Sequence, residues 1–534
     1  MAAGADNTDF PFGSARFAGP KELSQAGLYR RDPFSVLIGF DGELPLWYSG
    51  PGGAVLIAGA RSGKLNLLGF SLCAGVHSPS MVVLDMKGGE LAAVSQNQTL
   101  DRKYNIYWNP RALHGLRTSR INPVDYIRID SPTLVSDTKV FCENSIPPSG
   151  SAQSTYFEGR AREYLEAIAL TLTRKNDVLT LPDLYDAINL LVAGGDEWLD
   201  FAFEMTESGF PIAKRVEEEI GVSRGDSSGG FRGVLGELTN AFACLSDPTL
   251  IEAVSPPFDF SFADLCRSDQ TYNVYLMPPV EFAGAWSAVI KAMFVAGMIY
   301  KSRSPAAPRQ TWVLDECAQL GAFPLVVKLF TYGAGIGIRP WAVFQSVKQM
   351  KALGPDADTI ILSSAALQNW FGIRDLETAS MLSRMLGSET LRYTDEHRRE
   401  ASRHARLSAV QALASGRDPF RAALELAHHT RMAALPTLKA RPLRNADELL
   451  GLASDKQVIF VDGVMHPVLA DRRAYYDQVA MAGRFHPNPY HPPADRVRVM
   501  TRGGPVWRPV VVEPVPRAFA RYPQYADGLW SRIG

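Results

Sequence analysis

The sequence predicts an α/β protein with a mainly parallel sheet and an inserted all-α domain. Three observations lead to this fold class. Short continuous apolar runs recur along the chain, and such runs are typical of parallel strands that are buried on both faces. These runs alternate with segments of helical periodicity, which favours a doubly wound sheet. Between residues 156 and 256 only helical spacing occurs, broken by Gly- and Ser-rich turns.

The expected strands and helices follow one another along the chain. A helical piece at 20–27 precedes a hairpin turn at 39–42 and a strand at 44–48. The expected helices of the insertion lie at 160–172, 181–192, 216–221 and 231–245. The expected strands of the sheet lie at 54–57, 81–84, 104–108, 272–277, 311–316, 340–345 and 367–373, and a hairpin is expected at 458–463.

Length and composition bound the class of protein. A chain of 534 residues is too long for one compact domain, so two or three domains are expected. The net charge of −1 excludes a global basic field, so any nucleic-acid surface must be local. Five scattered cysteines without a CxxC pair fit a reducing compartment and no structural zinc.

We expect a cytoplasmic protein. No signal peptide is present, and the longest apolar stretch, residues 288–300, is too short to span a bilayer and is interrupted by Lys291. It reads as a buried helix.

Shifts in composition divide the chain into seven segments. They are an N-terminal lead-in (1–50), the first part of a nucleotide-binding domain (51–155), the all-α insertion (156–256), the second part of the nucleotide-binding domain (257–391), an Arg-rich helical segment (392–440), a C-terminal hairpin region (441–495) and an Arg-, Pro- and aromatic-rich tail (496–534). The helical segment is interpreted as a solvated helix face in preference to a DNA contact. The tail has little periodicity, which indicates an extended arm or partial disorder.

Residues 58–64 predict a phosphate-binding loop. The sequence AGARSGK follows an apolar strand and leads into a helix, and backbone N–H groups in such a loop cradle a phosphate at a helix N-terminus. Lys64 would reach the β- and γ-phosphates. Leu65 stands where such loops carry the Ser or Thr that binds Mg²⁺. The expected nucleotide contacts are Gly59, Ala60, Arg61, Ser62, Gly63, Lys64 and Leu65, together with Asp85.

Two carboxylates end the strand at 311–316. In nucleotide hydrolases the first holds the Mg²⁺ shell and the second activates the attacking water, so we assign Asp315 to Mg²⁺, through water, and Glu316 to catalysis. An Asp-Glu pair after an apolar strand, taken alone, is equally typical of a solvated strand end or a helix cap. The loop at Lys64 favours an ATP site with Mg²⁺.

Other strand ends supply further candidates. Asp85 and Lys87 follow the strand at 81–84, and ligands of open α/β sheets bind at the carboxyl ends of strands. Gln345 ends another strand, where it either senses the γ-phosphate or caps the strand. Arg374 follows the strand at 367–373 and is a candidate for stabilising transition-state charge on a neighbour's phosphates, although exposed arginines are common.

The motifs together resemble the coupling ATPases of type IV secretion and conjugation, the TraG-type DNA-transfer proteins. The resemblance runs from Gly13 to about His491. It rests on GSARFA at 13–18, RSGK at 61–64, LDMKG at 84–88, LDE at 314–316 with LG at 320–321, YG at 332–333, QS at 345–346, DLETA at 375–379 with LG at 386–387, RPL at 441–443 and GRFHPNPYH at 483–491.

The resemblance implies a RecA-like motor domain that assembles as a hexamer around a channel. It implies ATP hydrolysis coupled to the movement of single-stranded DNA with a relaxase, or of effector proteins, into a secretion channel at the inner membrane. The helical insertion would face the substrate. Typical members carry two transmembrane helices before the motif at 13–18, whereas only twelve residues precede it here. Either this is a naturally soluble member, or an anchor has been lost or trimmed; membrane contact would then be peripheral and through partners.

Two other functions remain open. A non-hydrolysing or weakly hydrolysing receptor of the same fold is favoured by Leu65 and by Ala58, which stands where the loop pattern has its first Gly. It is opposed by Asp315 and Glu316. A chromosomal DNA translocase of the related ring motors is disfavoured by the motifs at 13–18 and 483–491.

Overall fold

A computed structural model describes residues 10–73, 79–96, 103–148, 152–225, 229–393, 396–415, 419–434 and 437–534. The chain divides into two compact units. The larger unit comprises Pro20–Gly372, Ser454–Val464 and Leu469–Gly534, and the smaller unit comprises Met1–Gly19, Ile373–Ala453 and Met465–Val468. No helix among the described residues is long and apolar enough to cross a membrane.

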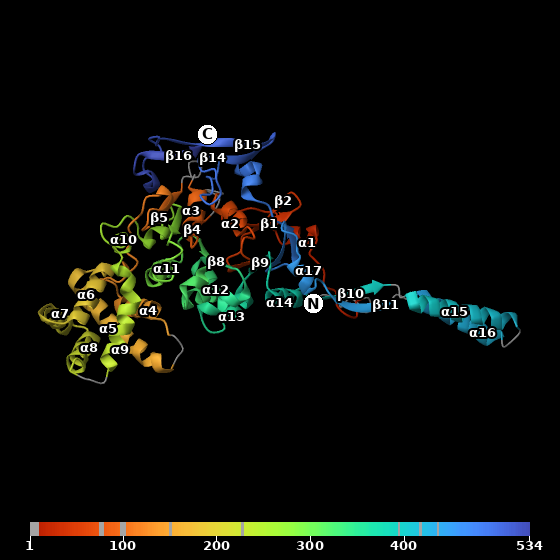
Figure 1. Ribbon diagram of the computed structural model, residues 1–534, viewed down its shortest axis with the longest axis horizontal. Helices are drawn as coiled ribbons and strands as arrows, with labels where there is room; N and C mark the ends of the chain where they lie inside the picture. Colours follow the sequence, from red (N-terminus) through yellow and green to blue (C-terminus); the bar gives the residue numbers. More distant parts are fainter. Residues whose placement is uncertain are drawn as a thin grey trace. The chain divides into compact units, whose positions relative to one another are not determined.

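An 11-stranded sheet forms the core of the larger unit (Figure 1). Its parallel part contains, in spatial order, β5 (Tyr104–Trp108), β6 (Tyr272–Leu276), β4 (Ser80–Leu84), β7 (Gln310–Asp315), β8 (Ile338–Phe344), β3 (Ala54–Ala58) and β9 (Leu367–Phe371). Almost every residue of these strands is buried, as their continuous apolar runs predict. The expected parallel strands are therefore confirmed, and their carboxyl ends meet at one edge.

Four antiparallel strands extend the sheet beyond β9. They are β12 (Lys456–Val461), β13 (Val468–Asp471), β1 (Val36–Asp41) and β2 (Leu44–Tyr48). Both expected hairpins form, but the first turns at Gly42 and not over 39–42, because Gly39 and Phe40 belong to β1. Part of the lead-in segment thus lies in the central sheet.

Helix α1 (Pro20–Gln25) precedes the first strand of the sheet. The segments between the parallel strands contain α2 (Lys64–Leu72), α3 (Glu90–Ser95), α4 (Leu134–Ser145), α11 (Ser287–Arg303), α12 (Pro324–Ile336) and α13 (Ala357–Ser364). Helix α2 packs against α3, and α12 packs against β8 and α13. The apolar stretch at 288–300 lies in α11, nearly all of it buried, so it is a core helix as expected.

The described residues of the insertion form helices joined by short connections. It contains α5 (Ala152–Asn176), α6 (Leu181–Ala193), α7 (Asp196–Glu207), α8 (Pro211–Ser223), α9 (Gly230–Phe242) and α10 (Pro248–Ala253). Helix α5 packs against α6, α7, α8 and α9 (Figure 1). The sequence reading missed α7, although Trp198, Phe201 and Met205 form its buried face at helical spacing.

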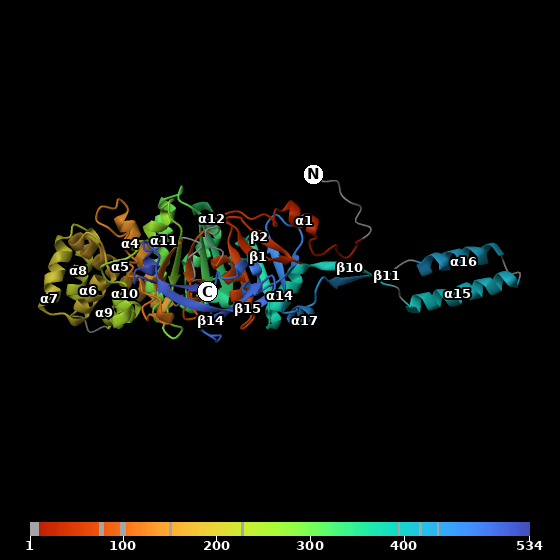
Figure 2. The same cartoon turned by 90° about the horizontal axis from the view of Figure 1, so that it is seen from above.

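The smaller unit carries two hairpins in series. Its elements are α14 (Leu376–Leu386), β10 (Ser388–Tyr393), α15 (Glu396–Ala414), α16 (Pro419–Ala434), β11 (Thr437–Pro442) and α17 (Ala446–Leu450). Strands β10 and β11 pair antiparallel along their whole length, and both views show them leading into the side-by-side helices α15 and α16 (Figures 1 and 2). Arg403 is exposed, as expected for a solvated helix face.

The tail does not form the expected extended or disordered arm; that prediction is wrong. Residues 496–534 form a three-stranded antiparallel sheet of β14 (Arg496–Thr501), β15 (Gly504–Pro514) and β16 (Leu529–Ile533). The first half of β15 pairs with β14 and the second half with β16. Each half of β15 therefore pairs with a strand on one side only. This explains why β15 tolerates its prolines, because proline is accepted where its N–H is not needed for a ladder.

Candidate nucleotide-binding site

The loop between β3 and α2 has the backbone of a phosphate cradle. Arg61 (φ 57°) and Gly63 (φ 81°) adopt the left-handed conformation, and α2 begins at Lys64. The Gly59 N–H donates to the Gly372 carbonyl (3.2 Å), and the Ser62 hydroxyl donates back to the Gly59 carbonyl (2.6 Å). A left-handed turn at a helix N-terminus aims N–H groups into one concavity, which suits an anion.

Two residues that the sequence reading missed hold this loop. The Arg472 guanidinium donates to the Ser62 carbonyl (2.5 Å) and lies 3.5 Å from the centre of the Phe371 ring. Burial lowers the pKa of Arg472 to about 10. A Cβ at Gly372, where φ is +56°, would lie 2.5 Å from the Ser62 Cβ, so only glycine allows this approach. Arg472 is remote in sequence and carries no motif that would have identified it.

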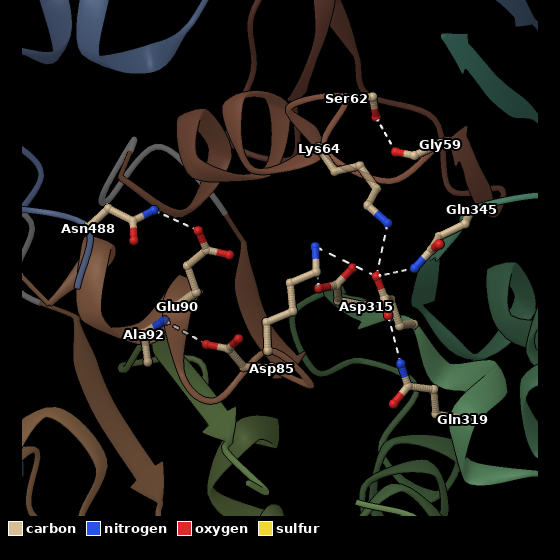
Figure 3. Close-up of polar contacts among 12 residues, drawn as sticks. Gly59, Ser62, Lys64, Asp85, Glu90, Ala92, Asp315, Gln319, Gln345 and Asn488 are labelled. Atoms are coloured by element: carbon tan, nitrogen blue, oxygen red, sulfur yellow. Dashed lines mark hydrogen bonds and ion pairs between the residues drawn. The ribbon is translucent and has the colours of Figure 1, made fainter. Parts of the chain in front are cut away.

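Lys64 and Glu316 form a buried ion pair at the sheet edge. The Lys64 Nζ lies 3.0 Å from the Glu316 Oε1, and the two side chains are 4% and 8% exposed. Gln345 donates to the same oxygen (2.9 Å), and Gln319 donates to the Oε2 (2.7 Å). Figure 3 shows Lys64 and Gln345 pointing toward the end of β7 from two different elements. Three residues that the sequence singled out are therefore brought together.

The backbone of Glu316 adopts a left-handed conformation. Its φ of 50° is unusual for a residue with a side chain, and such outliers are concentrated at functional sites. Burial opposes its ionisation, but the charge of Lys64 and the hydrogen bonds from Gln345 and Lys64 outweigh burial and lower the pKa of Glu316. The carboxylate is thus kept ionised beside the loop.

Asp315 lies deeper than Glu316. Its Oδ1 is buried without a hydrogen-bond partner among the described residues. Burial raises the pKa of Asp315, against the opposing charges of Lys87 and Lys64. An orphaned buried carboxylate oxygen suits a role as acceptor for water or as part of a cation's shell.

Asp85 and Lys87 have different surroundings. The Asp85 carboxylate accepts the Ala92 N–H of α3 (2.9 Å), and burial raises its pKa to about 7 (Figure 3). Lys87 reaches the carboxylates, with its Nζ 3.7 Å from both the Asp315 Oδ2 and the Glu316 Oε1. Burial alone would lower the pKa of Lys87, but the charges of Asp315 and Glu316 raise it overall.

A cavity of about 850 Å³ opens over this cluster. One wall consists of residues 60–66 of the loop with Lys87, Glu316 and Gln345, whereas Asp85 is not among the lining residues. The opposite wall comes from Tyr475, Tyr476, residues 485–488, 491–493, 496–498 and Trp507. The motif at 483–491 indicated family resemblance only, and nothing in the sequence placed this segment opposite the phosphate loop.

Arg374 belongs to the smaller unit, two residues beyond Gly372. Its assignment to catalysis stays a prediction.

Comparisons with known proteins identify the family of the chain. A family model described as type IV secretory system conjugative DNA transfer matches residues 19–415. The conjugal transfer protein TraG of Escherichia coli is 24% identical over 429 residues, which cover 72% of this chain and 65% of that protein. TraG of Rhizobium radiobacter is 23% identical over 428 residues, which cover 78% of this chain and 61% of that protein. The chain thus spans somewhat less than two thirds of the curated relatives it matches.

Solved structures share the fold. The conjugative coupling protein TrwBdeltaN70, in its unbound monoclinic form, aligns with a TM-score of 0.59 at 15% identity over 86% of this chain and 92% of that one. TrwB in complex with ADP and Mg²⁺ aligns with a TM-score of 0.58 at 15% identity, covering 86% and 94%. The α/β fold with a large, mostly parallel sheet and many helices is thereby confirmed.

Proposed function

Because the chain belongs to the type IV secretory system conjugative DNA transfer family, we propose that it is a coupling ATPase. It recruits single-stranded DNA linked to a relaxase, or a protein substrate, and drives it toward a secretion channel at the inner membrane. The observation that carries this proposal is the convergence of Lys64, Glu316 and Gln345 on one buried point beside the phosphate loop. By analogy with ring motors of this fold, the working form is a hexamer.

Nucleotide binding is assigned to the loop and Lys64. The N–H groups of residues 59–63 face the phosphates, and Lys64 exchanges its contact with Glu316 for the β- and γ-phosphates. TrwB has been solved with ADP and Mg²⁺ and with a non-hydrolysable ATP analogue, which supports the same ligand class here.

The residues fit Mg²⁺ only in part. Asp315 offers an unpartnered buried oxygen, whereas Leu65 has no hydroxyl to give. When bound with ATP, Mg²⁺ neutralises phosphate charge. We assign the water-mediated contact to Asp315 alone.

Hydrolysis is assigned to Glu316. Its ionised carboxylate accepts a proton from the attacking water, and Gln319 fixes its orientation through the 2.7 Å hydrogen bond. Gln345 follows β8 and donates to the same carboxylate. We assign it to sensing the γ-phosphate beside Glu316. Arg374 is proposed to act on a neighbouring subunit's nucleotide.

One observation favours a second function. Leu65 at the metal-binding position of the loop suits a receptor of the same fold that binds nucleotide and substrate but hydrolyses slowly or not at all.

Phosphate release from ATP, measured with and without single-stranded DNA, separates these functions. A motor shows turnover that DNA stimulates, and Lys64→Ala binds nucleotide at least about tenfold more weakly because a charge-assisted contact is lost. Lys328→Ala is the matched control, since this exposed lysine of α12 does not line the cavity. Unchanged affinity in Lys64→Ala would refute the assignment. Nucleotide binding without turnover in the presence of DNA would favour the receptor.

DNA binding adds a second criterion. With a net charge of −1, binding through local arginines should weaken as salt rises, with a slope of about −0.7 per phosphate contact. Binding indifferent to salt would count against a DNA motor.

A further inference from the structure

Trp507 is a large exposed aromatic ring on the wall of the nucleotide cavity. It lies on β15 opposite Arg498 of β14, and 53% of its surface is exposed. It lines the same cavity as residues 60–66 of the phosphate loop. Ligand pockets are lined mainly by hydrophobic and aromatic side chains, so a tryptophan exposed inside a concave site is a candidate ligand contact.

The sheet that carries Trp507 is fixed to the body of the larger unit. The His486 Nε2 lies 2.8 Å from the Ser531 hydroxyl, and Gln524 bonds both the Asn105 N–H (3.1 Å) and the Lys103 carbonyl (2.8 Å). The Tyr104 and Tyr522 rings lie 4.9 Å apart. These contacts tie β16, the β15–β16 connection and β5 together, so Trp507 is presented from an anchored element.

Neighbouring charges orient the ring. The Arg496 guanidinium lies 5.6 Å from the centre of the Trp507 indole, and Arg498 is paired with Asp477 at 3.2 Å. Both arginines also line the cavity. Cation–π contact on one side leaves the indole with one face for a ligand.

We propose that Trp507 is the stacking platform for the base of the nucleotide whose phosphates lie at Lys64. This inference rests on the proposed function. The cavity is lined by Lys64 and Lys87 near the loop and by the Trp507 ring, with Arg496 and Arg498, on the C-terminal sheet. A nucleoside triphosphate has an anionic tail for the lysines and a flat π-surface for the ring. Its volume of about 850 Å³ lies within the range of small-molecule sites.

The platform has consequences for specificity. Stacking on an aromatic ring is tolerant of the base, because every base has a π-face. ATP and GTP should therefore bind with similar affinity, and both should bind more tightly than inorganic triphosphate. The sheet lies beyond residues 19–415 that match the family model.

Calorimetric titration of the full chain with ATP and with inorganic triphosphate, each with Mg²⁺, tests the proposal. Trp507→Ala should weaken ATP binding roughly five- to 160-fold, the effect of stacking one base on an aromatic side chain, and should leave triphosphate binding unchanged. Trp507→Phe should retain ATP affinity within about threefold. Val512→Ala is the control, since Val512 is exposed on the same strand but does not line the cavity.

Two results would overturn the proposal while leaving the proposed function intact. They are unchanged ATP affinity in Trp507→Ala, and an equal loss of ATP and triphosphate, which would indicate a structural role for the ring. Lys64→Ala should lose both ligands. If the wild-type chain bound neither ligand, the proposed function would fail and the platform with it.

Discussion

Replacing Glu316 by glutamine should separate nucleotide binding from hydrolysis. The Lys64 Nζ lies 3.0 Å from the Glu316 Oε1 in a buried setting, so incoming phosphates must compete with this carboxylate for the lysine. In the variant Lys64 still donates a charge-assisted hydrogen bond, worth about 1.5–3 kcal/mol, to the amide oxygen, but the attraction between two opposite charges is lost. Glu316→Gln should therefore lower the cost of freeing Lys64 by about 1 kcal/mol, and ATP should bind roughly fivefold more tightly.

The same substitution should stop turnover. A glutamine amide cannot accept the proton of the attacking water, and loss of a general base typically costs about 10²–10⁴-fold in rate. The change is isosteric, and the Gln319 amide can turn to present its oxygen to the new NH₂ group, so the network of the site is preserved. Wild-type turnover is expected to be below the usual ~1 per second, and the variant should fall to background.

Phosphate release and ATP titration measure the two effects on one preparation. Glu90→Gln is the matched control, because Glu90 also lines the cavity but bonds Asn488 (2.6 Å) and not Lys64; it should change turnover by less than about threefold. Turnover that survives Glu316→Gln would mean that the carboxylates of β7 are misassigned. A clear loss of ATP affinity would mean that the ion pair does not compete with the nucleotide.

Three further predictions follow from the same site. Leu65→Thr should raise turnover about tenfold, since a hydroxyl near Mg²⁺ recovers about 1.4 kcal/mol of transition-state stabilisation, and phosphate release measures it. Gly372→Ala should lower the free energy of unfolding by about 1–3 kcal/mol and weaken ATP binding, because its Cβ would collide with Ser62; denaturant titration checks the first effect. Burial lowers the pKa of His486 to about 4 from its ordinary 6.5, so stability present above pH 6.5 should be lost as the pH falls through 4, by up to about 3 kcal/mol. Unfolding of wild type and His486→Gln from pH 7 to 4 should show this slope only in the wild type.

The edge of the sheet that carries the site could be predicted because short segments of sequence determine it. Strands that are buried on both faces are apolar throughout, and in a parallel sheet their carboxyl ends share one edge. Lys64, Glu316 and Gln345 each follow such a strand, so their convergence was implied by three separate short motifs. The structure places all three within hydrogen-bonding distance.

The second wall of the cavity could not be predicted, because it depends on long-range pairing. Pro505, Pro509 and Pro514 argue against a central strand, since proline gives no N–H to a ladder. The tail nevertheless forms a sheet, because β15 uses one half for β14 and the other for β16. Arg472 likewise contacts Ser62 across 410 positions of sequence, and no periodicity encodes that contact.

Leu65 bears on rate more than on affinity. The loop loses one oxygen ligand at this position but no charge, since the positive groups near the carboxylates are Lys64 and Lys87. Phosphate binding depends on those charges and on the N–H groups of the loop, both of which are present. Metal support of the transition state is the quantity that a missing hydroxyl reduces. A motor and a non-hydrolysing receptor would therefore bind ATP alike, and only turnover, in the wild type and in Leu65→Thr, distinguishes them.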